Sequence, residues 1–139
     1  MVAAKDAHTQ FTRALLDMRG FLFYPDGMDT YEKGYRANIQ LSYSIMNDYV
    51  AKVHKPELKA KGEEVKKLIG DYIKLGDRVI AAKRANDPNL AKITGEGRAL
   101  VAAIDKGCVE LTEAQRQTLL KETQTMVAHV QDRSNNALL

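Results

Sequence analysis

The chain has 139 residues, a formal net charge of +3 and a single cysteine, Cys108. This length suits one domain over residues 1–139, and so small a net charge gives no reason to expect a nucleic-acid partner. One cysteine allows neither an intrachain disulfide nor a cysteine cluster for a metal, and among small and apolar neighbours it is expected to be a packing residue. No apolar run approaches the ~20 residues of a membrane-spanning helix.

Apolar residues recur at steps of three and four along four segments, which Pro25, Pro56 and Pro88 separate. This spacing is typical of helices that bury one face, and no segment shows the alternation of a half-buried strand. The predicted buried positions are Ala4, Ala7, Phe11, Ala14, Met18 and Phe21; Ile39, Tyr43, Met46, Val50 and Val53; Leu58, Val65, Leu68, Tyr72, Leu75, Val79 and Ala82; and Leu90, Ile93, Leu100, Ile104 and Leu111.

These four segments predict an all-α fold. Because short turns join long helices, we expect an up-down-up-down antiparallel four-helix bundle. Pro56 and Pro88 are each expected in the first turn of a helix, where the missing N–H costs little, and Asp87 is placed to cap the fourth helix.

The end of the chain supports two interpretations. In the first, which we favour, one long fourth helix runs from about residue 88 to 134, because a glycine inside a helix costs only ~1 kcal/mol. In the second, Gly107 interrupts this helix and Thr112 with Gln115 forms a capping box that starts another one.

A second stripe on the first helix lies beside its buried face. Leu16 and Phe23 are apolar, and a monomeric bundle needs only one buried face, so this flank predicts contact with a second copy of the chain. Scattered apolar surface residues are the alternative. The candidate dimer-interface residues are His8, Thr12, Leu16 and Phe23.

Polar side chains on three helices form the candidate ligand site. On the second helix, Tyr35 and Asn38 belong to a polar row that either satisfies itself across the bundle or lines a pocket. Arg19 on the first helix and Thr94 and Arg98 on the fourth would converge near one end if these helices are neighbours. Two arginines and a hydroxyl suit a small organic anion, although an ordinary exposed or salt-bridged arginine is the alternative for Arg19.

The sequence contains no recognisable catalytic or metal-binding pattern. No histidines are spaced as ligands on one helix, and no phosphate-binding loop or nucleophile elbow is present. We therefore expect no enzymatic activity, no cofactor and no metal.

Two stretches carry a resemblance to a known family. The segment FTRALLDMRGFLFYPDGMDTYEKGY, in which a helix ends in Arg-Gly-aromatic-Leu before a short turn, and the later GRALVAAID resemble the extracellular four-helix-bundle sensor domains of bacterial methyl-accepting chemotaxis proteins. The chain is also similar to the related helical sensors of histidine kinases.

The resemblance implies a homodimeric sensor outside the membrane, held by transmembrane helices that precede the first helix and follow the fourth. It implies a ligand site towards the membrane-distal end, which by position falls on Arg19, Thr94 and Arg98. The ligand would be a small metabolite, an anion by the residues above, or a ligand-loaded periplasmic binding protein. The signal would pass by a small displacement of the fourth helix. A structural or interaction bundle without a small-molecule site is the rival hypothesis.

The aromatic run from Phe21 to Tyr24 lies at the tip that this arrangement leaves open. We expect Phe21, Leu22, Phe23 and Tyr24 to close the end of the bundle while Pro25, Asp26 and Gly27 reverse the chain.

Overall fold

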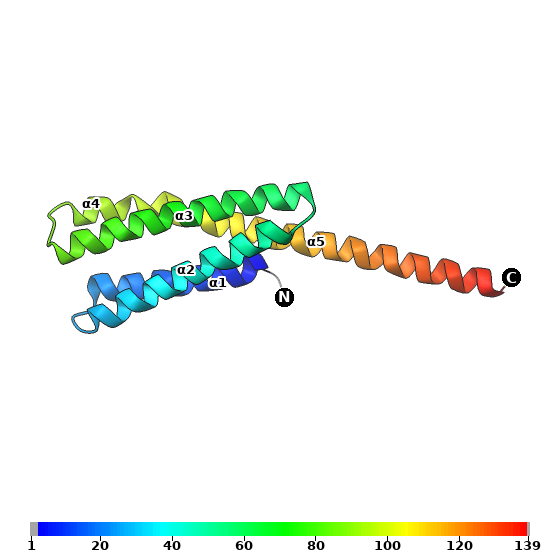
Figure 1. Cartoon of the computed structure of the whole chain (residues 1–139), viewed down its shortest axis with the longest axis horizontal. Coiled ribbons are helices and arrows are strands. Elements are labelled where there is room, and N and C mark those ends of the chain that lie inside the picture. The colour runs from blue at the N-terminus through cyan, green and yellow to red at the C-terminus, as the bar shows by residue number, and fades with distance from the viewer. Residues whose placement is uncertain (1–2, 139) are drawn as a thin grey trace.

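A computed structural model describes residues 3–138 of the chain as five helical segments. The segments are α1 (Ala3–Phe23), α2 (Met28–Lys52), α3 (Pro56–Arg84), α4 (Leu90–Gly95) and α5 (Gly97–Leu138). α1, α2 and α3 and the joined α4 and α5 form a four-helix bundle with antiparallel neighbours, as the sequence predicts. The α1–α2 and α3–α4 turns lie at one end, and α5 projects from the other (Figure 1).

The predicted buried faces are confirmed at most positions. Six of the predicted residues are only partly buried and pack against the core: Tyr43, Val53, Leu68, Leu90, Ile93 and Leu100. All six positions predicted on α1 are buried, and Phe11 and Phe21 on this face are at most 1% exposed. The lone cysteine, Cys108, is fully buried with Ile104 and Leu111 on α5, which confirms its packing role. The core is thus a continuous apolar strip between the four helical rods.

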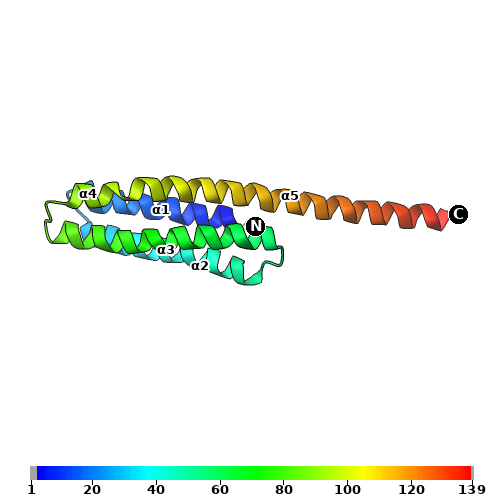
Figure 2. The ribbon, with the colours of Figure 1, turned by 90° about the horizontal axis from the view of Figure 1, so that it is seen from above.

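The long fourth helix is confirmed. It has one interruption, which does not fall at Gly107, where the alternative interpretation placed it. α5 runs without a break through Gly107 and Thr112, and the Thr112 hydroxyl donates to the carbonyl of Cys108 instead of capping a new helix. The interruption falls at Glu96, between α4 and α5. Its dihedral angles remain right-handed helical, so α4 and α5 follow nearly one line (Figure 2).

The two prolines differ in position relative to their helices. Pro56 occupies the first turn of α3, as predicted. The prediction for Pro88 is wrong, because α4 begins two residues later at Leu90. The Asp87 carboxylate accepts a hydrogen bond of 2.8 Å from the backbone N–H of Asn89, so it orders the turn before the helix.

The aromatic run closes the tip only in part. Phe21 is buried, but Phe23 is 74% and Tyr24 is 52% exposed. The ring of Tyr24 packs edge-on against Tyr31 with 5.3 Å between centroids. Tyr31 in turn lies against Gly20, where an added Cβ would come within 2.5 Å of its ring. The Arg-Gly pair before the aromatic run therefore leaves room for a tyrosine of α2.

The polar row on α2 satisfies itself in part across the bundle. The buried Ser42 hydroxyl donates to the Ala7 carbonyl at 2.7 Å, and the Asn38 amide donates to the Asp17 carboxylate at 2.8 Å. The Tyr35 hydroxyl is buried and has no hydrogen-bond partner within the described residues. Burial raises the pKa of Tyr35, so this phenol stays protonated.

Ionic contacts fasten α2 to α3 at the end that carries the α3–α4 turn. Arg84 near the end of α3 reaches Asp29 at 2.6 Å and Glu32 at 2.8 Å, and its guanidinium lies 5.5 Å from the centroid of Phe21. Arg36 continues the chain of charges to Asp77 at 2.9 Å. The groups are largely exposed, so these contacts fix the register of α2 and α3 more than they add stability.

We expect Gly76→Ala to lower the free energy of unfolding by about 1–3 kcal/mol, because a Cβ at this position would overlap the buried hydroxyl of Tyr35. Urea denaturation measures the change. Gly95→Ala is the control, because a Cβ there meets nothing within 4 Å, and it should leave stability unchanged or slightly raised. Equal losses in the two variants would contradict the overlap.

Tyr35→Phe alone should be neutral or stabilising, because it removes an unpaired buried hydroxyl.

Candidate functional site

A groove runs between α1 and the rod formed by α4 and α5, at the end of the bundle that carries the α1–α2 and α3–α4 turns. This open groove has a volume of about 460 Å³, which lies within the range of small-molecule sites. Arg19 from α1 and Thr94 and Arg98 from the opposite rod all line it. The structure therefore brings together the three residues that the sequence predicts to converge here.

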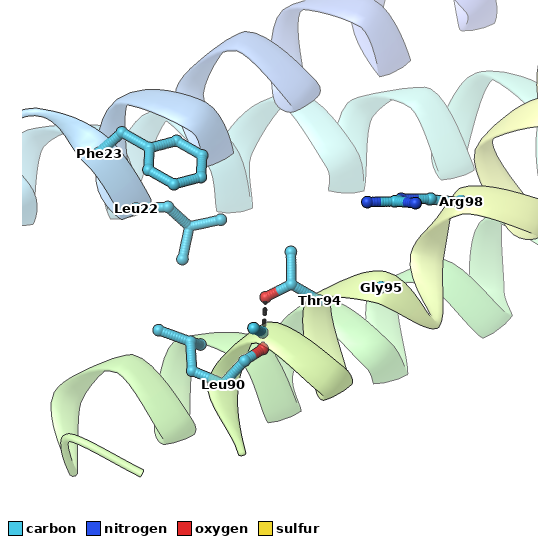
Figure 3. Close-up of a pocket in the computed structure, with 7 residues that line it drawn as sticks. Leu22, Phe23, Leu90, Thr94, Gly95 and Arg98 are labelled. Atoms are coloured by element: carbon cyan, nitrogen blue, oxygen red, sulfur yellow. Dashed lines mark hydrogen bonds between the residues drawn. The ribbon is translucent and has the colours of Figure 1, made fainter. Parts of the chain in front are cut away.

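A second hollow of about 370 Å³ continues the groove towards the turns. Leu22 and Phe23 of α1 form one wall, and Leu90, Thr94 and Arg98 form the other. Figure 3 shows the two α1 side chains across the space from Thr94 and Arg98. The two hollows share residues, and together they make one site, which we call the α1–α5 groove.

The two arginines are the positive charges of this groove. Arg36, Arg78 and Arg84 elsewhere in the bundle each pair with a carboxylate at 3.2 Å or less. Arg19 and Arg98 have no carboxylate within 4.0 Å among residues 3–138. Two such guanidiniums beside a cavity are suited to bind an anion with paired hydrogen bonds.

Thr94 contributes its methyl group to the groove more than its hydroxyl. The hydroxyl donates its proton to the Leu90 carbonyl at 2.8 Å, one turn earlier on α4. Figure 3 shows the oxygen turned towards this carbonyl and the methyl group towards the space between the helices. An anion therefore finds its donors on the arginines, because the Thr94 proton is already in use.

Asp105 adds a negative charge at the other end of the groove. Its Oδ1 lies 2.8 Å from Nε2 of His8, so this carboxylate joins α5 to α1. Seven residues separate it from Arg98, which is about 10 Å along a helix. The groove is therefore positive at the level of Arg19 and Arg98 and negative about two turns further along α5.

The remaining walls are mainly apolar. Leu15, Met18 and Leu22 come from α1, Tyr72 from α3 and Val101 from α5. Burial raises the pKa of Tyr72 to about 12, so its phenol is neutral at physiological pH and adds no charge. The groove thus combines two cations with an apolar wall.

Two other candidate ligand residues do not reach the groove. Tyr35 is 1% exposed in the core, with its ring 6.4 Å from that of Tyr72 and its hydroxyl against Gly76 of α3. Asn38 lies at the contact of α2 with α1, where Asp17 accepts its hydrogen bond. Both residues act inside the bundle, on seams other than the one that opens into the groove.

The four candidate dimer-interface residues occupy different environments. His8 is bound within the chain to Asp105, and Phe23 lines the groove while remaining 74% exposed. Thr12 is exposed, and its hydroxyl donates to the carbonyl of His8. Leu16 is 57% exposed and lines neither hollow of the groove. The predicted contact with a second copy stays a prediction.

Comparisons of the chain with family models, with curated proteins and with solved structures found no match. Residues 3–138 contain no group of three or more His, Cys, Asp or Glu side chains arranged to hold a metal ion. No helix in this range is both long and apolar enough to cross a membrane. The site is therefore interpreted from its own geometry.

The sequence did not place the apolar residues Leu22 and Val101 in the candidate ligand site, and it assigned Leu22 only to the closure of the bundle tip. Leu22 follows Arg19 by three residues, and Val101 follows Arg98 by three, so each lies one turn beyond an arginine on the same helix face. This common spacing was the signal that could have placed them in the groove.

Cys108 offers a test of how tightly the bundle closes below the groove. Burial raises the pKa of this thiol to about 12, and burial also blocks access. We expect iodoacetamide at pH 8 to leave Cys108 largely unmodified in the folded protein and to alkylate it readily in urea, as mass spectrometry can follow.

The matched control carries Cys108→Ala with Val109→Cys, which moves the thiol to a neighbouring position that is 59% exposed. It should react in both conditions. A folded wild-type protein that is alkylated as fast as this variant would show that the bundle opens at the level of Cys108.

Proposed function

We propose that this domain is the extracytoplasmic sensory domain of a chemotaxis transducer, that it binds a small organic anion in the α1–α5 groove and that it passes the signal along α5. The observation that carries the proposal is the groove itself, in which Arg19 and Arg98 lie on opposite walls without carboxylate partners in the described chain. An anion held by both arginines would connect α1 to α5.

The position of the groove on α5 supports a sensory role. Arg98, Val101 and Asp105 belong to the first turns of a helix of 42 residues. The same helix leaves the bundle at the opposite end, and its side chains from Lys121 to Ala137 are all exposed (Figure 1). A ligand in the groove at one end of the bundle would therefore contact α5, the helix that extends from the other end.

The chemotaxis class and the membrane setting follow from the sequence resemblance. In this proposal, membrane helices outside the present chain would hold the domain at the cell surface or in the periplasm as a homodimer. The sensor of a histidine kinase has the same features, so the output domain decides between the two classes. Direct binding of a metabolite is favoured over binding of a loaded periplasmic protein, because the groove has the volume of a small-molecule site.

A structural or interaction bundle is the second candidate, and the end of α5 favours it. Leu119, Met126 and Val130 are each more than 60% exposed and recur at steps of seven and four on one helix face. Such a stripe is typical of a helix that packs against another helix. In this alternative the α5 stripe binds a partner helix, and the groove holds no ligand.

A thermal-shift screen against organic acids, amino acids and aromatic acids tests the proposal. A ligand at 100 times its dissociation constant should stabilise the fold by ~2.7 kcal/mol, which raises Tm by several degrees in a domain of this size. Arg19→Ala and Arg98→Ala should each abolish the shift, because both remove a cation from the groove.

Arg13→Ala is the matched control, because Arg13 is exposed on the same helix as Arg19 and does not line the groove. It should retain the shift. If no compound stabilises the wild-type domain, the proposal of direct sensing fails and the interaction bundle becomes the better account. Met126→Glu should then weaken self-association of the domain, as measured by sedimentation, because it places a charge in the exposed α5 stripe.

A further inference from the structure

We infer that the α1–α5 groove selects monocarboxylates that carry an aromatic or branched apolar body, and that it discriminates against dicarboxylates and zwitterionic amino acids. The inference rests on the proposed function, which requires only that some organic anion binds. It names the class of anion from the arrangement of charged and apolar groups along the groove.

The carboxylate end of the ligand belongs at the level of the two arginines. Arg19 and Arg98 lie on facing walls and are the arginines of the groove. A carboxylate has two oxygens, so it can accept hydrogen bonds from both guanidiniums at once. The Thr94 hydroxyl already donates to Leu90, which leaves the arginines as the charged donors at this level.

The body of the ligand would lie against apolar side chains on either side of the arginines. Towards the turns, Leu22, Phe23 and Leu90 line the smaller hollow. Towards the middle of the bundle, Leu15 and Val101 line the larger one. Phe23 is 74% exposed, so a ligand that covers its ring removes apolar surface from water.

Asp105 supplies the discrimination against a second carboxylate. It lies about two helical turns from Arg98 along the groove, and it is held in place by His8 at 2.8 Å. A second negative charge that extends into the larger hollow approaches this carboxylate, and one that extends into the smaller hollow meets the apolar side chains of Leu22, Phe23 and Leu90. In both directions a charged group loses water without gaining a partner of opposite sign.

The ammonium of an α-amino acid is disfavoured for a related reason. It is attached one carbon from the carboxylate, so it must lie at the level of Arg19 and Arg98 and cannot reach Asp105. The ammonium and the two guanidiniums carry like charges and repel each other, and this repulsion grows as the ligand excludes water. A neutral substituent at the same carbon avoids this cost.

Isothermal titration calorimetry with a matched set of probes tests the inference. The probes are 3-phenylpropionate, L-phenylalanine, which differs from it by one ammonium group, 3-phenylpropionamide, which lacks the charge, and succinate, which has a second carboxylate in place of the ring. We expect 3-phenylpropionate to bind at least tenfold more tightly than each of the other three.

Variants locate the two parts of the ligand. Arg19→Gln and Arg98→Gln should each weaken 3-phenylpropionate at least tenfold, and Arg13→Gln should not. Phe23→Ala should weaken it severalfold, whereas Leu16→Ala, a similarly exposed apolar residue on the same helix outside the groove, should not. Asp105→Asn should improve succinate relative to 3-phenylpropionate.

The outcomes separate this inference from the proposed function. If succinate or L-phenylalanine binds as tightly as 3-phenylpropionate and still depends on both arginines, the inference is overturned while the anion sensor stands. If 3-phenylpropionate binds equally well to the arginine variants, its site is elsewhere and the inference fails. If no carboxylate binds, the inference and the proposed direct sensor fail together.

Discussion

The groove depends on an asymmetry in how closely the helices approach one another. At the seam of α1 with α2, Gly20 receives the ring of Tyr31, and between α2 and α3, Gly76 receives Tyr35. Between α3 and α5, Gly107 lies against Val65. None of the nine glycines takes a side chain at the α1–α5 seam within the described residues. Glycines therefore allow close approach at three seams, and the α1–α5 groove lies at the fourth.

The open seam is nevertheless anchored at its other end. His8 contacts Asp105 at 2.8 Å, and the backbone N–H of Ala4 lies 3.4 Å from the side-chain oxygen of Gln115. Ala4, whose N–H makes the second of these contacts, is fully buried. The seam thus has a fixed end and an open end, and α4, which contributes no buried residue, lies at the open end. This geometry places unpaired arginines beside apolar walls without disrupting the core.

The sequence predicted the fold because a helix that buries one face places an apolar residue on that face at every turn, and this spacing can be read locally. On α1, all the positions predicted to be buried between Ala4 and Phe21 are buried. It predicted the convergence of Arg19 and Arg98 because chain order and antiparallel packing fix which helix ends meet. It did not exclude Tyr35, because periodicity shows which face a residue occupies but not whether a neighbour such as Gly76 leaves room for its ring. The interruption at Glu96 also escaped prediction, because the glycines on either side of it weaken a helix without fixing whether it breaks there.

The continuity of α5 matters for how a signal could travel. If α5 rocks as a rigid rod about the His8–Asp105 contact, the arm towards Arg98 is ~10 Å long and the arm towards residue 138 is ~50 Å. A displacement of ~0.5 Å at the groove would then become ~2.5 Å at the far end, less whatever the contacts with α3 resist. A break at Gly107, the alternative that the sequence left open, would have absorbed this motion two residues beyond the pivot. Gly107 instead lies inside the unbroken helix α5 and against Val65, so this glycine lets α3 and α5 pack closely without interrupting α5.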